Sequence, residues 1–324
     1  MESAAEPEPP NRLGPTVHRS VLPVEAIETL ALRPGMLVVD GTMGGAGHTL
    51  SLAEQVGPTG RVLALDADAG AIERAAGLIG GKNIEPIHAN FRDLPEVLRE
   101  RGIAGVDAIL VDLGLSSDQL ADRERGFSFQ TDGPLDLRFD VSTGESAGEM
   151  LDRLDERRLA DLIFEYGEER ASRRIAREIV RQRRPDVAWT ADRLAQLVSR
   201  CVPRSPQHAI HPATRTFQAL RIAVNGELES LELLLRDSPS LLKPGGRLGV
   251  ISFHSLEDRR VKEAFRDDPR WEVVTRKPIR PRDAEVELNP RSRTARLRVA
   301  ARRDAAAERR AAEMPAAPKR FLGS

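Results

Sequence analysis

Cysteine is nearly absent from this chain of 324 residues, in which Cys201 is the only one. A single thiol forms no intramolecular disulfide, and it excludes a metal site built on a cysteine cluster. No apolar run approaches the ~20 residues of a membrane-spanning helix, so we expect no membrane partner. The first 14 residues are acidic and proline-rich, and they lack the basic start and apolar centre of a signal peptide. These absences predict a protein of the reducing cytoplasm.

Aromatic residues are also scarce, at 4 %, and the net charge of −1 provides no global field that attracts nucleic acid. The charge is nevertheless uneven, because residues 170–215 carry eleven arginines against three acidic residues, and residues 291–310 carry eight against two. Only five of the 49 basic residues are lysine. The guanidinium group forks onto phosphate and stacks on bases, so these segments are candidates for contact with RNA. Alternatively, arginine is enriched throughout the chain, and these segments are charged helix faces that contact only solvent.

The stretch 38–48, VVDGTMGGAGH, is the most informative part of the chain. An apolar run ends in Asp40, four glycines follow within seven positions, and a helix-compatible stretch extends to residue 56. Glycines let the backbone approach a ligand, and the N-terminus of a helix attracts an anion. A second apolar run ends in Asp66, 19 residues after the last glycine of the loop, close to the spacing at which an acid reaches ribose hydroxyls. The pattern predicts a site for an adenosine cofactor, with a ligand-free glycine turn as the alternative.

The glycine spacing departs from that of dinucleotide-binding proteins. A pyrophosphate favours G-x-G-x-x-G, and the sequence from Gly45 reads GAGHTL, without the third glycine. This departure counts against a nicotinamide dehydrogenase, the first competing interpretation. The loop suits a smaller anion, such as the carboxylate of S-adenosylmethionine.

Apolar runs alternate with helix-compatible stretches through the first third of the chain. The expected strands are 36–40, 61–66, 84–89 and 106–113, with a helix over 69–79. This alternation predicts an α/β fold with a parallel sheet covered on both faces. Ligands of such sheets bind at the carboxyl ends of the strands. Four predicted strand ends therefore mark one edge as the site, namely Asp40, Asp66, Asn90–Phe91 and Asp112.

The next clear strand, 246–253, follows only after about 130 residues, far more than a single connecting helix needs. We therefore predict a discontinuous sheet domain of residues 16–116 and 213–302, with a smaller helical domain, 117–212, inserted into it. Residues 214–235 are expected to form one long helix that returns to the sheet. Segments 271–275 and 294–300 are expected to pair as an antiparallel hairpin that closes it. Residues 1–15 and 303–324 are predicted to be disordered.

Longer motifs extend from about His18 to Ala300. They are HRSVLPVE (18–25), VDLGLSSDQL (111–120), RGFSF (125–129), DGPLDLR (132–138), YGEER (166–170), HPATRTFQALRI (211–222), GGRL (245–248), ISFHSLEDR (251–259) and NPR (289–291). Together with the glycine loop they resemble the bacterial small-subunit (16S) ribosomal RNA cytosine-N4 methyltransferases. The resemblance implies a Rossmann-like class I methyltransferase sheet, S-adenosylmethionine as methyl donor, and the N4 amine of a cytidine near the decoding centre of 16S rRNA as acceptor. The oligomeric state, monomer or homodimer, stays open.

The resemblance also implies which residues hold the cofactor. Ala46, Gly47 and His48 would hold its methionine end, Asp66 the ribose, Phe91 the adenine, and Asp112 with Gln119 would complete the pocket. This chain departs from the family pattern at two positions. Ala46 replaces a usual glycine, and its backbone contact requires a negative φ; Phe139 replaces a usual methionine.

Transfer of a methyl group from a sulfonium is an in-line displacement, in which the protein mainly orients the reactants. The N4 lone pair of cytosine is delocalised, so an acceptor for the N4 hydrogen would help. We expect Asp112 to be this catalytic residue, with a role in cofactor binding alone as the alternative. His254 is expected either to contact the base or cofactor or, more simply, to fix its loop through Glu257 or Asp258. The pair His208 and His211 could suggest a metal, but no third ligand is evident, and we expect none.

Recognition of RNA commonly uses unpaired bases that stack on aromatic or arginine side chains. Phe127, Phe129 and Phe139 lie near Arg123, Arg125 and Arg138 in the sequence, and they are either such a platform or the core of the inserted domain. Arginines 173, 177 and 181 are the expected phosphate contacts. Two further competing interpretations remain. A DNA amine methyltransferase would carry a proline–aromatic motif that is absent here, and a non-enzymatic RNA-binding protein would not explain the strand-end acids.

Overall fold

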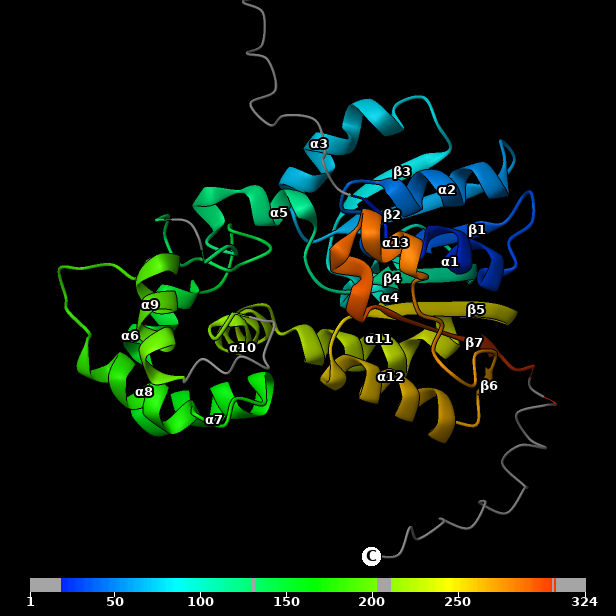
Figure 1. The fold of residues 1–324 in the computed structure, drawn as a ribbon. Coiled ribbons are helices and arrows are strands. Elements are labelled where there is room, and N and C mark those ends of the chain that lie inside the picture. The colour runs from blue at the N-terminus through cyan, green and yellow to red at the C-terminus, as the bar shows by residue number, and fades with distance from the viewer. Residues whose placement is uncertain (1–18, 130–131, 203–210, 305, 307–324) are drawn as a thin grey trace, which may run out of the picture.

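The computed structural model of this chain describes residues 19–129, 132–202, 211–304 and 306. Its centre is a seven-stranded sheet in the order β3-β2-β1-β4-β5-β7-β6 (Figure 1). The first five strands in this order are parallel, and β7 runs antiparallel between β5 and β6. The strands are β1 (Leu37–Asp40), β2 (Arg61–Asp66), β3 (Ile84–His88), β4 (Val106–Asp112), β5 (Leu242–Ser252), β6 (Trp271–Val273) and β7 (Arg296–Arg302). The predicted α/β class and the closing antiparallel pair are confirmed.

Helices cover both faces of the sheet, because successive side chains of a strand point to opposite faces. Val38 of β1 packs on the face of α1 (Pro23–Leu30) and α2 (Gly47–Val56). Val39 packs on the face of α4 (Leu94–Glu100), α11 (Glu227–Leu241) and α12 (Ser255–Asp267). A further helix, α3 (Ala69–Ile79), packs through Ala75 and Ile79 against Met43 and Ala64. Buried strands of this kind have continuous apolar sequences, and this is why the sequence predicted them within a few residues.

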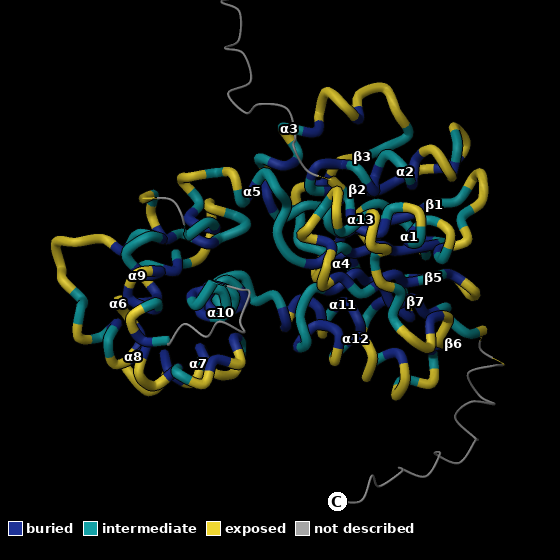
Figure 2. The backbone as a smooth tube through the Cα atoms, viewed as in Figure 1, coloured by how far each residue is buried: buried dark blue, intermediate teal, exposed yellow. Residues whose placement is uncertain are grey.

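Other helices pack around a second hydrophobic core beside the sheet (Figures 1 and 2). We call them the helical lobe; they are α5 (Ser117–Ala121), α6 (Ala147–Arg153), α7 (Glu156–Gly167), α8 (Ser172–Arg181), α9 (Ala191–Cys201) and α10 (Thr214–Asn225). Apolar residues at helical spacing, such as Ile175 and Ile179 of α8, form this core. Its separation from the sheet core gives the molecule two lobes.

The prediction of one helix over 214–235 is wrong, because Gly226 separates α10 from α11. Its φ of 59° lies in the left-handed region, which ends α10 and turns the chain. Phe217 and Leu220 of α10 pack in the helical core, whereas Leu231 of α11 packs against the sheet. The division into domains stays a prediction, and these contacts favour a boundary near Gly226 over one at residue 212.

Parts of the predicted ends lie outside the described residues, namely 1–15 and nearly all of 303–324. At the start of the latter, the Arg303 N–H donates to the Arg270 carbonyl at 2.9 Å, so residue 303 still belongs to the edge of the sheet lobe. In the described part of the chain, no helix is long and apolar enough to cross a membrane.

Candidate active site

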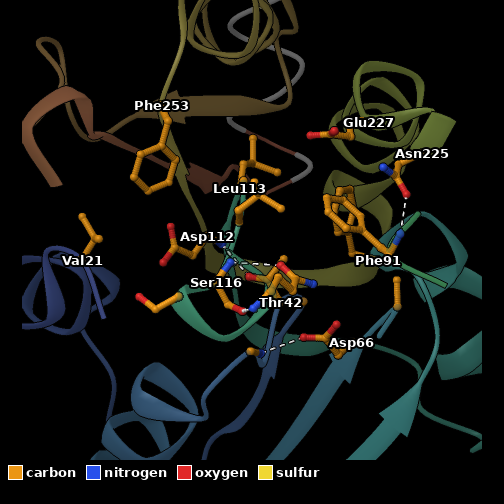
Figure 3. A pocket seen from close by; sticks show the side chains of 18 of the residues that line it. Val21, Thr42, Asp66, Phe91, Asp112, Leu113, Ser116, Asn225, Glu227 and Phe253 are labelled. Carbon is orange, nitrogen blue, oxygen red and sulfur yellow. Dashed lines mark hydrogen bonds between the residues drawn. The ribbon is translucent and has the colours of Figure 1, made fainter. Parts of the chain in front are cut away.

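A pocket opens at the carboxyl edge of the parallel strands, between the two lobes (Figure 3). The loop after β1 contributes Gly41 and Gly44, and the ends of β2 and β4 contribute Asp66 and Asp112. The helical lobe contributes a further wall. Of the seven predicted cofactor residues, the pocket lining contains Asp66, Phe91, Asp112 and Gln119.

Asp40 lies beneath the pocket and organises the glycine loop from below. Its side chain accepts hydrogen bonds from Thr49 Oγ1 (2.7 Å) and the Thr42 N–H (3.1 Å), and it is 1 % exposed. Burial raises the pKa of Asp40 to about 6, although these two hydrogen bonds favour the carboxylate and lower it. Asp40 therefore supports the loop and does not line the pocket, unlike the other predicted strand-end residues.

Asp66 fixes the top of the same loop from the neighbouring strand. Its Oδ2 accepts from the Gly44 N–H at 2.7 Å, and its Oδ1 accepts from the Asp68 N–H at 2.8 Å. Burial raises the pKa of Asp66 to about 6, although both bonds favour the carboxylate. Each carboxylate oxygen has more than one lone pair, so Asp66 can still accept from a hydroxyl in the pocket.

Close packing of the loop against β4 requires glycine at position 41. A Cβ atom there would lie 2.9 Å from Val111 Cγ2 and 3.1 Å from Phe91 Cβ. Glycine 41 thus lets Phe91, which follows β3, approach the loop and line the pocket beside it.

Ala46, Gly47 and His48 lie behind the loop, at the start of α2, and are not part of the pocket lining. The negative φ that a backbone contact of Ala46 would require is not present: its φ is 63°, in the left-handed region, where a Cβ costs about 1–2 kcal/mol. The turn enforces this conformation, since the Ala46 N–H donates to the Met43 carbonyl at 2.7 Å and the Leu50 N–H donates to the Ala46 carbonyl at 2.9 Å. The methyl group is fully buried against α3, which offsets part of the strain.

The ring of His48 lies between the Val21 carbonyl and the carboxylate of Asp112. Its Nε2 lies 2.9 Å from the Val21 carbonyl, which can only accept, so Nε2 carries the hydrogen. Burial lowers the pKa of His48 to about 4, and the ring is therefore neutral at pH 7. Its unprotonated Nδ1 then faces Asp112 Oδ2 at 3.6 Å and offers that carboxylate no donor.

Asp112 is the acidic side chain of the pocket with the fewest internal partners. Its N–H donates to Thr42 Oγ1 at 2.7 Å, which fixes its backbone. Its Oδ1 is buried and has no hydrogen-bond partner among the described residues. Burial raises the pKa of Asp112 well above its ordinary value, and the charges of Asp40, Glu257 and Glu285 raise it further. A carboxyl group in this state is suited to accept a hydrogen bond or a proton from a ligand amine.

Gln119 uses both ends of its amide within the protein. Its Oε1 accepts from the Ser116 N–H at 3.0 Å in a capping box, and its Nε2 lies 3.3 Å from Asp68 Oδ2. Its predicted contact with a cofactor stays a prediction, because the structure shows it as a buried part of the pocket wall.

Arg125 joins the loop after β2 to the helical lobe. Its Nη1 lies 3.4 Å from Oδ1 of Asp68, which is 2 % exposed. Its Nη2 donates to the carbonyls of Arg138 (2.8 Å) and Phe139 (2.7 Å). Phe139 lines the pocket, so one guanidinium group sets the position of this wall relative to the strand ends.

Asn225, at the end of α10, holds the same wall from the other side. Its Oδ1 accepts from the Phe139 N–H and its Nδ2 donates to the Leu137 carbonyl, each at 2.7 Å. Leu137 has a φ of 62°, and these bonds help to maintain that strained conformation. Phe139, at the second departure from the family pattern, is thus held by two polar contacts and packs on Phe127 with ring centroids 5.9 Å apart.

His254 lies as the simpler of its two interpretations has it. His254 Nε2 lies 3.0 Å from Glu257 Oε1, and the Glu257 carboxylate accepts from the Phe253 N–H, so these residues fix the loop after β5. His211 stacks on Phe129 with ring centroids 4.6 Å apart, and His208 lies outside the described residues. Within the described ranges, no cluster of three or more histidine, cysteine or acidic side chains could hold a metal.

The sequence pointed to the acids and to Phe91 because they end apolar runs. It missed the contacts of Thr42, Arg125 and Asn225, whose partners lie far away in the chain. Thr42 belongs to the glycine loop, and that position could have singled it out. Asn225 lies in a helix and carries no local signal for a contact 86 residues away.

Comparisons with known proteins agree on one family. The model of the MraW methylase family matches residues 15–303. A protein of Rhodopirellula baltica named ribosomal RNA small subunit methyltransferase H is 48 % identical over 298 residues, which cover 89 % of this chain and 92 % of that protein. Proteins of the same name from Cyanothece sp. (48 %, covering 91 % and 98 %) and Thermomicrobium roseum (47 %, covering 89 % and 94 %) are similarly close.

Substitution of Arg125 by methionine tests its structural role. The change leaves Asp68 with its Arg74, Gln119 and Gly70 contacts and removes the donor to two carbonyls, and we expect a loss of about 2–4 kcal/mol in the free energy of unfolding. Arg123→Met, on an exposed neighbour in the same turn, is the matched control and should change it by less than about 0.5 kcal/mol. Urea unfolding of both variants makes the comparison, and equal losses would contradict the role.

Proposed function

This chain belongs to the MraW methylase family, and from that membership we propose that it transfers a methyl group from S-adenosylmethionine to the exocyclic N4 amine of a cytidine in 16S rRNA, near the decoding centre. The observation that carries the proposal is the meeting of Asp66, Phe91 and Asp112 in one pocket at the carboxyl edge of a parallel sheet (Figure 3). The names of the relatives and the motifs that end in this pocket support rRNA as the substrate. The place of action is then the cytoplasm, where ribosomal subunits are assembled.

The residues in the pocket fit the chemical groups of this cofactor. Asp66 can accept from the ribose hydroxyls, Phe91 offers an apolar face to the adenine, and the loop at Gly44 leaves room for the methionine end. Ala46, Gly47 and His48 support that loop from behind, so their proposed contribution to cofactor binding is mainly through its shape. When bound, the cofactor supplies a methyl group already activated by the sulfonium.

The protein's own contribution is to orient the acceptor, exclude water and receive a proton. Orientation of this kind contributes roughly 7–11 kcal/mol toward a displacement. We assign to Asp112 the hydrogen bond to N4–H, because its Oδ1 is buried without a partner at the end of β4. Accepting that hydrogen increases electron density on N4, and the ionised carboxyl can take the proton that N4 releases when its bond to carbon forms. The neutral His48 leaves the Asp112 carboxylate unneutralised, which preserves its basicity.

The cofactor contact of Asp66 predicts a pH dependence. Its pKa is raised from 3.8 to about 6, so lowering the pH from 7.5 to 5.0 protonates it and removes an acceptor for the ribose. Affinity for S-adenosylmethionine should therefore fall over this range. In Asp66→Asn, we expect roughly 10- to 100-fold weaker binding at pH 7.5 and the loss of most of the pH dependence, since bonds to charged groups contribute ~1.5–3 kcal/mol. Isothermal titration calorimetry measures both, and an identical pH profile in the variant would refute the assignment.

The role of Asp112 predicts a selective loss of turnover. Asp112→Asn keeps the shape of the side chain but cannot take a proton, and kcat should fall about 10²–10⁴-fold with little change in cofactor affinity. Because the pKa of Asp112 is raised, kcat of the native enzyme should increase with pH as this carboxyl group ionises, and the variant should lack this increase.

The control for this experiment is Asp107→Asn, at the opposite end of the same strand, where the carboxylate pairs with Lys243 at 2.8 Å. It should leave kcat unchanged. Unchanged turnover in Asp112→Asn would assign this residue to cofactor binding alone.

The substrate is tested by offering three acceptors with labelled S-adenosylmethionine. We expect methyl transfer to small ribosomal subunits or to their deproteinised RNA, and none to duplex DNA. The ratio of the rates on assembled subunits and naked RNA decides which form the enzyme recognises. Transfer to DNA alone would support the competing interpretation as a DNA amine methyltransferase.

A further inference from the structure

The segment between β6 and β7 carries a concentration of positive charge to the pocket. Residues 276–293, here called the basic segment, contain six arginine or lysine residues and three acidic ones. The segment includes α13 (Asp283–Leu288) and enters β7 at Arg296, which pairs with Ser252 at the carboxyl end of β5. It therefore returns to the edge of the sheet where the pocket opens.

Contacts of the basic segment place part of it on the pocket wall. Asn289 and Arg291 line the pocket, as does Arg19 from the N-terminal side. Asn289 Nδ2 donates to the Arg19 carbonyl, and Arg19 Nη1 donates to the Leu288 carbonyl, each at 3.4 Å. Leu288 is 72 % exposed beside them, which adds an apolar surface to the same rim.

Several cations of this segment have no internal use. Arg276, Lys277, Arg280 and Arg293 are exposed, and within the described ranges no ion pair or hydrogen bond engages their charged groups. Arg282 is exposed and pairs with the partly buried Glu25 at 3.5 Å. Such a set of free charges, on a segment that reaches the pocket wall, is suited to an anionic ligand.

Of the three α8 arginines that the sequence favoured as phosphate contacts, Arg177 and Arg181 form ion pairs, whereas Arg173 is exposed. Arg181 pairs with Glu178 at 2.6 Å, and Arg177 pairs with Glu156 at 3.5 Å. Figure 1 shows α8 at the outer side of the helical lobe, away from the sheet edge.

The cofactor cannot account for the free charges of the basic segment. S-adenosylmethionine carries one carboxylate and no phosphate, and its sulfonium and amino groups are positive. A polynucleotide carries one negative charge per nucleotide, and a nucleotide inserted into the pocket leaves its flanking phosphates at the rim.

We propose that the basic segment, together with Arg19, binds the RNA backbone on either side of the target cytidine. This inference rests on the proposed function and names the surface that holds its substrate. The guanidinium groups bind phosphates, and Leu288 packs against an adjacent ribose or unstacked base.

The test removes three free charges that do not line the pocket, in the variant Arg276→Gln/Lys277→Gln/Arg280→Gln. The control, Arg236→Gln/Lys262→Gln/Arg266→Gln, removes the same charge from exposed positions on α11 and α12. Binding of a small-subunit rRNA fragment is measured by filter binding between 50 and 300 mM salt, and binding of S-adenosylmethionine by calorimetry. Since each contact to a single strand contributes about 0.7 to the salt slope, the first variant should lose about 2 units of slope and on the order of 100-fold in affinity at 0.1 M salt.

Cofactor affinity should stay within about twofold of the native value in both variants, which shows that they fold. Native RNA affinity in the first variant, or equal losses in both, would overturn the proposal. A defect seen only with assembled subunits and not with naked RNA would also overturn it, in favour of contact with a ribosomal protein. If the native enzyme binds the RNA but does not methylate it, the proposed function is refuted, whereas the assignment of this surface to RNA binding stands.

Discussion

The hydrogen bond from the Gly44 N–H to the Asp66 carboxylate is the contact on which the rest of the site depends. It joins the glycine loop after β1 to the end of β2, and together with the Asp40–Thr49 bond it fixes a loop that could otherwise adopt many conformations. The position of the loop then places Thr42 under Asp112 and His48 beside it. Burial of three carboxylates at one sheet edge costs stability, and their raised pKa values record that cost.

The second constraint is that the pocket lies between two separate hydrophobic cores. A small apolar cluster joins the lobes, in which Ile222 and Tyr166 of the helical lobe pack with Leu228 and Leu256 of the sheet lobe. Polar contacts also cross between the lobes, from Arg125 to Asp68 and from Ser255 Oγ to Glu168. Hydrogen bonds are directional, so a small number of them can set the width of the pocket to within the tolerance that methyl transfer requires.

The sequence predicted the parallel sheet and its edge well, because buried strands are continuous apolar runs and because strand ends of such a sheet meet at one edge. It failed where the outcome depends on contacts distant in the chain. The break at Gly226 follows from packing of α10 and α11 on two different cores. A single glycine within an apolar helical pattern does not distinguish a break from a continuous helix. The roles of Arg125 and Asn225 arise only once the lobes are together.

The central claim is that this pocket orients a cofactor with its ribose at Asp66 and its sulfur directed toward Asp112. A crystal structure of the protein with S-adenosylhomocysteine tests it most directly. The account predicts ribose hydroxyls within hydrogen-bond distance of Asp66, the adenine beside Phe91, and open space between the sulfur and Asp112 Oδ1. A cofactor bound in the reverse orientation, with its methionine end at Asp66, or one bound outside the carboxyl edge of the sheet, would contradict it.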